Sequence, residues 1–138
     1  MSKLYHLLFT SIARDDLDDV ALYDLLIESA ENNRQNQLTG LLAYRDGAFL
    51  ETLEGDRKRV FETYDRIKDD ERHIDVTLLE LEPIEERQFT GFNMCFESKL
   101  EKTLSQSGHY MNYTDAESLL SDIKKPTKGV IEMLTMIC

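Results

Sequence analysis

The sequence is poor in several residue types, and each shortage excludes a class of protein. Its 138 residues include no tryptophan, two prolines and two cysteines, Cys95 and Cys138. Two cysteines without a C-x-x-C spacing provide neither a disulfide framework nor a paired metal site. The three histidines, His6, His73 and His109, lie far apart in the chain and form no local metal motif. We therefore expect neither a disulfide-rich secreted protein nor a metal centre.

Long hydrophobic runs and an excess of basic residues are also missing. No apolar run reaches the length of a membrane span, and no basic and then apolar leader opens the chain. Lys and Arg number 16 against 27 Asp and Glu, which gives a net charge of -11. Because this charge repels phosphates, it disfavours binding to nucleic acid and to anionic membranes. We expect a cytoplasmic protein that binds neither.

What the sequence does contain is an alternation of strand and helix patterns over its first 98 residues. Asp46-Gly47 is a hairpin signal, Asp56 suits the N-cap of a helix, and Pro83 is expected to break a strand. The patterns predict strands over residues 4–11, 38–45, 48–54, 74–81 and 92–98, and helices over residues 15–32 and 57–69.

This order, β-α-β-β-α-β-β, predicts an α+β fold of the ferredoxin-like type with one extra strand and both helices on one face of the sheet. We expect this domain to span residues 1–98. Residues 99–138 read as a helical extension, with a capping box that opens a helix over 114–124 and an apolar helix over 130–137. Such an extension packs on the open face of the sheet or on a neighbouring subunit.

Glu51 is the most informative residue of the domain. In a strand, alternate side chains share a face, so Phe49, Glu51 and Leu53 point the same way, toward the core. A buried charge is costly, and such a carboxyl finds a donor, takes up a proton or contacts a ligand.

Four blocks of sequence around this residue resemble the BLUF family, the flavin-based sensors of blue light. They occur in the family's order and spacing and cover about residues 4–98: Asn32-Asn33-Arg34-Gln35-Asn36-Gln37-Leu38-Thr39-Gly40-Leu41-Leu42, Ala48-Phe49-Leu50-Glu51-Thr52-Leu53-Glu54-Gly55, Arg66-Ile67-Lys68-Asp69-Asp70-Glu71-Arg72-His73, and Pro83-Ile84 with Arg87-Gln88-Phe89-Thr90-Gly91-Phe92-Asn93-Met94. The short extension is similar to that of single-domain members, which implies a homo-oligomer.

The resemblance implies that FAD binds between the two helices. Asn33 matches the asparagine whose amide contacts the flavin ring, and an amide offers that edge both a donor and an acceptor. Arg66, Asp70 and His73 match residues that line the flavin. Arg66 and Asp70 are four residues apart and are expected to brace one another. Without the resemblance, the same spacing reads as a solvated ion pair beside an exposed histidine.

Two residues depart from the family pattern, and both belong to its photochemistry. Phe9 stands where the family has the first-strand tyrosine that gives an electron and a proton to the excited flavin. Glu51 stands where the family has the glutamine whose amide switches its hydrogen bonds. We therefore predict that the usual red-shifted state fails to form or forms poorly.

The carboxyl of Glu51 has a chemistry that an amide lacks. Ionised, it only accepts hydrogen bonds and would repel the flavin N5 and O4 atoms, whereas the neutral acid has one O–H to donate. Burial favours the neutral form. Reduced flavin carries a hydrogen at N5, and an ionised Glu51 would accept a hydrogen bond from it. The site is therefore expected to favour a reduced flavin or to couple the flavin state to a proton.

Signal output is expected through the last strand, where Met94 matches the family and Phe92 replaces a tryptophan, and through the C-terminal helices. A protein partner is expected to receive this signal by binding. We expect no enzymatic activity. The alternative is a flavin-free BLUF fold that acts only through protein contacts. A ferredoxin-like enzyme that uses Glu51 as a general acid or base is weakly supported, because no histidine or second carboxylate accompanies it in the motif.

Overall fold

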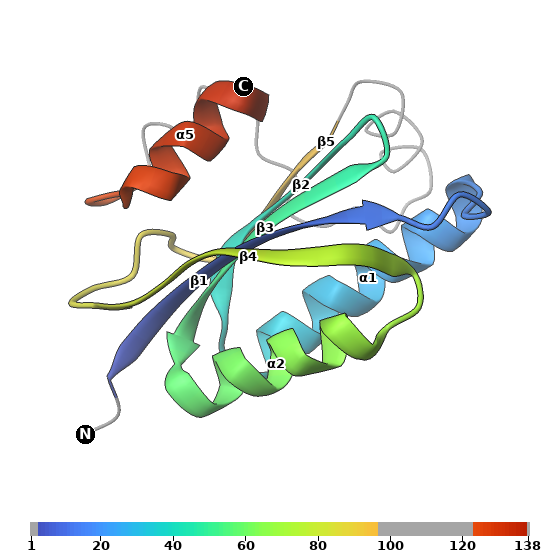
Figure 1. Ribbon diagram of the computed structural model, residues 1–138. Coiled ribbons are helices and arrows are strands. Elements are labelled where there is room, and N and C mark those ends of the chain that lie inside the picture. The colour runs from blue at the N-terminus through green and yellow to red at the C-terminus, as the bar shows by residue number, and fades with distance from the viewer. Residues whose placement is uncertain (1–2, 97–122, 138) are drawn as a thin grey trace.

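The computed structural model describes residues 3–96 and 123–137. Its described part contains one sheet and three helices (Figure 1). The strands are β1 (Leu4–Ala13), β2 (Thr39–Arg45), β3 (Ala48–Asp56), β4 (His73–Ile84) and β5 (Phe92–Phe96), and the helices are α1 (Asp19–Gln35), α2 (Arg57–Asp69) and α5 (Lys128–Ile137).

The strands follow the order β4-β1-β3-β2-β5 across the sheet. Neighbours are antiparallel except β2 and β5, which are parallel. Helices α1 and α2 cover one face of the sheet, and α5 lies on the other (Figure 1). The predicted ferredoxin-like α+β fold is therefore confirmed.

Two hydrophobic clusters hold these layers together. Between the sheet and the first two helices, Leu7, Phe9 and Phe49 pack against side chains such as Leu26 and Val60. On the opposite face, the α5 side chains Val130, Met133 and Leu134 are buried against Leu8, Leu41 and Ala43. Successive residues of β1 and β2 thus serve the two clusters in turn, as the alternation of side chains along a strand requires.

Helix boundaries follow the caps that the sequence provides. Helix α2 begins at Arg57, as predicted, and the Asp56 carboxylate accepts hydrogen bonds from the amides of Lys58 and Arg59. Helix α1 begins at Asp19, four residues later than predicted, because Asp18 is its N-cap and accepts from the Ala21 amide. Residues 15–18, which the prediction placed in the helix, precede it.

Strand β4 is longer than predicted and runs through Pro83. The expectation that Pro83 breaks the strand was wrong, because β4 is an edge strand that pairs only with β1. A proline is tolerated where the position of its missing N–H faces away from the neighbouring strand.

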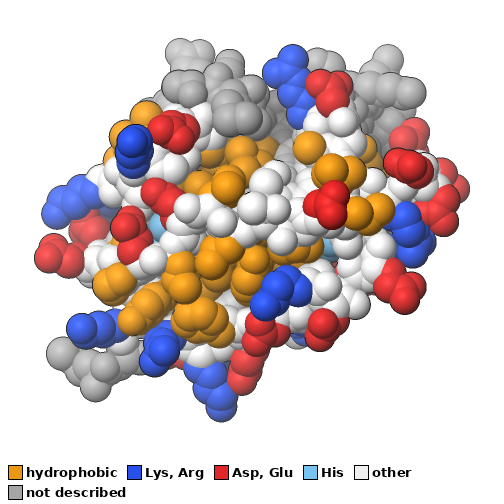
Figure 2. All heavy atoms as spheres, in the orientation of Figure 1, with side chains coloured by type: hydrophobic (Ala, Val, Ile, Leu, Met, Phe, Trp, Pro, Cys, Tyr) orange, Lys and Arg blue, Asp and Glu red, His pale blue; other side chains and the backbone are white. Residues whose placement is uncertain are grey.

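The edge strand β4 exposes large hydrophobic side chains. In Figure 2, hydrophobic side chains gather on both sides of the backbone that crosses the centre of the view, where β4 lies in Figure 1. The exposed large hydrophobics of β4 are Ile74, Leu78, Leu79 and Leu81. A long apolar edge of this kind favours pairing with another chain.

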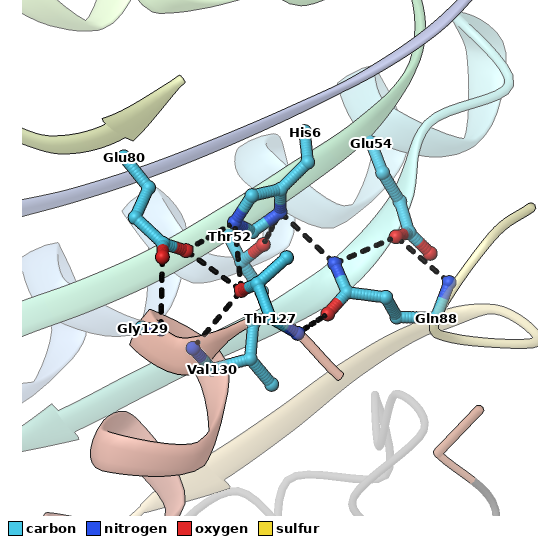
Figure 3. A network of polar contacts seen from close by, with 8 residues as sticks. All are labelled: His6, Thr52, Glu54, Glu80, Gln88, Thr127, Gly129 and Val130. Atoms are coloured by element: carbon cyan, nitrogen blue, oxygen red, sulfur yellow. Dashed lines mark hydrogen bonds and ion pairs between the residues drawn. The ribbon is translucent and has the colours of Figure 1, made fainter. Parts of the chain in front are cut away.

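A polar network joins α5 to the sheet (Figure 3). The Glu80 carboxylate of β4 accepts hydrogen bonds from the Gly129 amide at 2.8 Å and the Thr127 hydroxyl at 2.7 Å, and His6 Nε2 lies 2.8 Å from it. The Thr127 hydroxyl also accepts from the Val130 amide at 3.2 Å. The first turn of α5 is thus capped by Thr127 and by a carboxylate from the sheet, which suits the positive end of a helix.

Gln88 fixes the tautomer of His6 in this network. Its Oε1 accepts from the Thr127 amide, so its Nε2 is the donor, 3.1 Å from His6 Nδ1 and 3.4 Å from Glu54 Oε2. His6 Nδ1 therefore accepts, and the proton of the neutral ring is on Nε2, from which it is donated to Glu80. Glu54 in turn accepts from the amides of Gln88 and Phe89.

Residues 114–122 of the helix predicted over 114–124, and most of the extension from residue 99, lie outside the described residues, and the last two residues of that prediction, 123 and 124, are not helical. The last two residues of the strand predicted over 92–98 also lie outside the described residues. In the described part of the extension, the expected apolar helix is α5, at Lys128–Ile137.

Candidate functional site

A cavity lies between α1 and α2, and the helix-covered face of the sheet closes it. It measures about 130 Å³. Five residues singled out from the sequence line it together: Asn33, Glu51, Arg66, Asp70 and His73. The other lining residues are Leu25, Glu28, Ser29, Asn32, Thr63, Ile67 and Arg72. Residues up to 48 positions apart in the chain, Leu25 and His73, thus meet at one place.

Glu51 is buried in the cavity wall. It stands in β3 between Phe9 of β1 and Leu42 of β2, its two cross-strand partners, and is 2% exposed. Its Oε2 accepts one hydrogen bond, from Asn33 Nδ2 at 3.3 Å. Burial raises the pKa of Glu51 to about 8, and the bond from Asn33 opposes this rise. The carboxyl is therefore largely neutral at pH 7.

Asn33 lies in the last turn of α1 and is also buried. Its amide group is engaged on both sides, because its Oδ1 accepts from Asn32 Nδ2 at 3.5 Å while its Nδ2 donates to Glu51. Sequence reasoning placed Asn33 and Glu51 in one site but did not foresee that they contact each other.

Phe9 is fully buried but does not line the cavity. Its ring packs against Tyr64 of α2, with centroids 5.5 Å apart, and lies 6.4 Å from the ring of His73. The sequence analysis did not foresee the contact between Tyr64 and Phe9. Burial raises the pKa of Tyr64, and Lys68 Nζ lies 4.9 Å from its ring centroid.

His73 is buried at the start of β4. Its Nδ1 lies 2.7 Å from the Ser11 hydroxyl, and its ring centroid is 4.9 Å from that of Phe49. Burial lowers its pKa, so the ring is mainly neutral at pH 7. His73 is thus not the exposed histidine that the spacing alone would suggest.

Charged side chains stand at the mouth of the cavity, in an arrangement that differs from the predicted one. Asp70 pairs with Arg72, at 2.7 Å, and not with Arg66. Asp70 is the C-cap of α2, so its backbone leaves the helix and directs the carboxylate to Arg72. The hydrogen bond from Arg72 lowers the pKa of Asp70. Arg72 also contacts Glu28 of α1 at 2.7 Å and so links α1 to the segment that follows α2.

The two residues predicted for signalling lie elsewhere. Phe92 and Met94 line a separate cavity beside α1, with Arg34 and Arg87 among its other lining residues. Met94 is nevertheless in register with the site, since Met94 pairs with Leu42 and Leu42 pairs with Glu51. Phe9, Glu51, Leu42 and Met94 therefore form one row across β1, β3, β2 and β5.

Among the described residues, no group of histidines, cysteines and carboxylates is arranged to hold a metal ion. The same part of the chain contains no helix that is long and apolar enough to cross a membrane.

Comparisons of the sequence with a family model and with known proteins indicate the same family. The family model described as sensors of blue light using FAD matches residues 4–95. The beta subunit of a photoactivated adenylate cyclase from Euglena gracilis is 34% identical over 88 residues, which are 64% of this chain and 10% of that protein. A beta-like protein of the same organism is 28% identical over 124 residues, 90% of this chain and 14% of the relative. The chain thus spans 10–14% of the length of these relatives.

Solved structures that resemble this chain are consistent with the family match. The dark-state structure of BlrB, a BLUF protein, superposes with a TM-score of 0.63 at 29% identity and covers 78% of this chain and 82% of its own. The structure of Klebsiella pneumoniae BlrP1 with FMN and cyclic diGMP superposes with a TM-score of 0.71 over 97% of this chain and 34% of its own. At 23% identity, the second comparison shows the fold alone.

Proposed function

Because this chain belongs to the BLUF family, the sensors of blue light that use FAD, we propose that it is a flavin-binding regulatory protein whose usual photocycle is impaired or absent. The observation that carries this proposal is the pairing of Phe9 with Glu51 across β1 and β3. By the resemblance, other members of the family have the tyrosine and the glutamine of the photochemistry at these two positions.

The residues around the cavity fit the cofactor by their chemistry. At its closed end, the Asn33 amide and the Glu51 carboxyl offer hydrogen bonds to the polar edge of a flavin ring. Leu25 and Ile67 would provide apolar contact for the ring, and Arg66 and Asp70 stand along the remaining wall. The volume of about 130 Å³ is smaller than a three-ring cofactor needs, so entry must displace side chains. Arg66 is exposed and free to move outward.

The two substitutions remove the groups that transfer the proton in the usual photocycle. The bound cofactor supplies light absorption and electron acceptance. A phenyl ring at position 9 has no hydroxyl proton to give, and the carboxyl at position 51 lacks the N–H₂ group of an amide. Among the described residues, Tyr64 is a phenol in ring contact with Phe9, but the Lys68 ammonium over its ring disfavours loss of an electron.

The remaining features support a sensory and not a catalytic role. Glu51 has no second carboxylate within hydrogen-bonding distance in the described chain, and its one partner there is an amide. Output would pass along the row from Glu51 through Leu42 to Met94 and on to a protein partner or a second copy of the chain. Cyclase activity, which belongs to the named relatives as whole proteins, is not part of the proposal.

The visible absorption spectrum of the purified protein, in the dark and under blue light, tests the proposal. Bands of oxidised flavin that do not shift under light are the expected result. A reversible red shift would show that the photocycle runs without its tyrosine and glutamine and would contradict the impairment. Absence of flavin bands after addition of FAD would contradict flavin binding.

A flavin-free interaction module is the second candidate. The exposed hydrophobic side chains of the edge strand β4 favour it, because this surface suits pairing with another chain whether or not the cavity binds FAD. The spectrum distinguishes the two candidates directly.

A further inference from the structure

In the cavity, the two groups best suited to bind the flavin ring bind each other. Asn33 Nδ2 donates to Glu51 Oε2 at 3.3 Å, and both residues are at most 2% exposed. While one N–H of the Asn33 amide is donated to Glu51, the amide cannot direct both of its N–H groups toward a ligand. Binding of a ligand at this end of the cavity therefore competes with the Asn33–Glu51 hydrogen bond.

The strength of this internal bond depends on the charge of Glu51. A carboxylate accepts a stronger hydrogen bond from an amide than a neutral acid does, because one partner is charged. The ionised form of Glu51 therefore holds Asn33 more firmly, and the neutral form releases it more readily. The neutral form also has an O–H that can be donated to an acceptor atom of a ligand.

Charged groups from three elements face the same cavity, and among the described residues none pairs with Glu51. Helix α1 contributes Glu28, α2 contributes Arg66, and the segment from the end of α2 into β4 contributes Asp70, Arg72 and His73. Arg72 is engaged by Asp70 and Glu28, and His73 contacts Ser11. Arg66 lines the cavity but forms no ion pair with Glu51, so the ionised form of Glu51 is not stabilised by a salt bridge among the described residues.

We propose that the Asn33–Glu51 pair makes binding of FAD dependent on a proton: the protein binds oxidised FAD with Glu51 neutral and loses affinity as Glu51 ionises. This inference rests on the proposed flavin binding and adds a condition to it. Ionisation of Glu51 lowers the affinity for FAD in two ways. It strengthens the Asn33–Glu51 hydrogen bond, and it places a negative charge next to the acceptor atoms of the flavin ring.

The pH range over which the affinity changes follows from the burial of the Glu51 carboxyl. Burial raises the pKa of Glu51 to about 8, so the neutral form predominates below that value and declines above it. When only one form binds, the observed affinity falls in proportion to the fraction of that form. Affinity is expected to be nearly constant between pH 6 and 7 and to be roughly tenfold weaker at pH 9.

The test is a titration of the full chain with oxidised FAD, followed by flavin fluorescence, at pH values from 6 to 9. Glu51→Gln is the informative variant, because glutamine has nearly the same shape and does not titrate. We expect the wild type to lose about tenfold in affinity between pH 7 and 9, and Glu51→Gln to change little. Glu28→Gln is the matched control. It removes a carboxylate from the mouth of the same cavity and is expected to keep the pH dependence.

A second measurement follows Glu51 itself by the ¹³C resonance of its side-chain carboxyl, with and without FAD. Linkage requires that a ligand that prefers the neutral form raises the pKa of the group. An unchanged pKa on FAD binding, a pH-independent affinity in the wild type, or an equal loss in Glu51→Gln would overturn the inference while leaving flavin binding intact. Failure of both proteins to bind FAD at any pH would instead overturn the proposed function.

Discussion

Phe9 and Glu51 are direct cross-strand partners in the centre of the sheet, on the face that α1 and α2 cover. The row continues through Leu42 to Met94, so the last strand lies two strands away from Glu51, at roughly 10 Å for strand spacings near 4.8 Å. A change at Glu51 can thus reach β5 through a single intervening side chain.

The stability of the fold should depend on the protonation of Glu51. Its pKa in the folded protein, about 8, lies above the ordinary value of 4.5, so the neutral form is favoured by folding. This contribution is fully present below pH 4.5 and is lost as the pH rises to about 8. The total loss is about 5 kcal/mol for the rise in pKa from 4.5 to about 8, at about 1.4 kcal/mol per pH unit, and about 3 kcal/mol of it falls between pH 5.5 and pH 9. Urea unfolding at pH 5.5 and pH 9 measures it.

Glu51→Gln isolates this contribution, because other groups titrate alike in both proteins. The difference in unfolding free energy between variant and wild type should grow in favour of the variant between pH 5.5 and 9. A difference that stays constant over this range would mean that Glu51 titrates near its ordinary value, in contradiction to its burial.

Restoration of both family residues should restore the light response. In Phe9→Tyr/Glu51→Gln, the phenol and the amide occupy directly paired positions of β1 and β3. We expect a reversible red shift of the flavin bands in the double variant and none in either single variant. A single variant that responded fully would show that only one of the two substitutions matters.

The contact of Glu80 with the first turn of α5 should stabilise the docking of that helix. The Glu80→Gln substitution weakens charge-assisted bonds to Thr127, Gly129 and His6, at a cost of about 2 kcal/mol. Burial opposes the charge of Glu80, but these bonds outweigh it and lower its pKa. The contribution is therefore present above the ordinary glutamate value of 4.5 and is lost as the pH falls through the lower value of the folded protein. Hydrogen exchange of the α5 amides reports the effect.

Glu82→Gln is the matched control for this experiment. Glu82 is exposed two residues further along the same strand, and its substitution should leave exchange in α5 unchanged. Equal exchange in α5 for Glu80→Gln and wild type would show that the hydrophobic contacts of Val130 and Met133 hold the helix without help from the network.

Gly40 should tolerate no side chain. Its φ is +150°, and a Cβ atom there would lie 2.0 Å from the Thr52 carbonyl oxygen of the neighbouring strand. Gly40→Ala must separate β2 from β3 beside the site, so we expect a loss of at least about 3 kcal/mol in a urea unfolding experiment. Gly91→Ala, where a Cβ would meet no atom within 4 Å, should cost less than about 1 kcal/mol.

Local sequence was sufficient for most of the fold. The Asp46-Gly47 turn, the Asp56 cap and the alternation of apolar residues act between residues close in the chain, so the hairpin, helix α2 and the element order could be read directly. The prediction failed at Pro83 because whether a strand tolerates proline depends on its place at the sheet edge.

The sequence by itself determined the family, the order of elements, and the presence of phenylalanine and glutamate at positions 9 and 51. Tertiary structure alone decided what these side chains contact. The Asn33–Glu51 hydrogen bond joins residues 18 apart, the Asp70–Arg72 pair forms because α2 ends at Asp70, and the His6–Glu80 contact spans 74 positions. Such contacts depend on strand register and on where helices end, which are set by the packing of the whole chain and not by any local pattern.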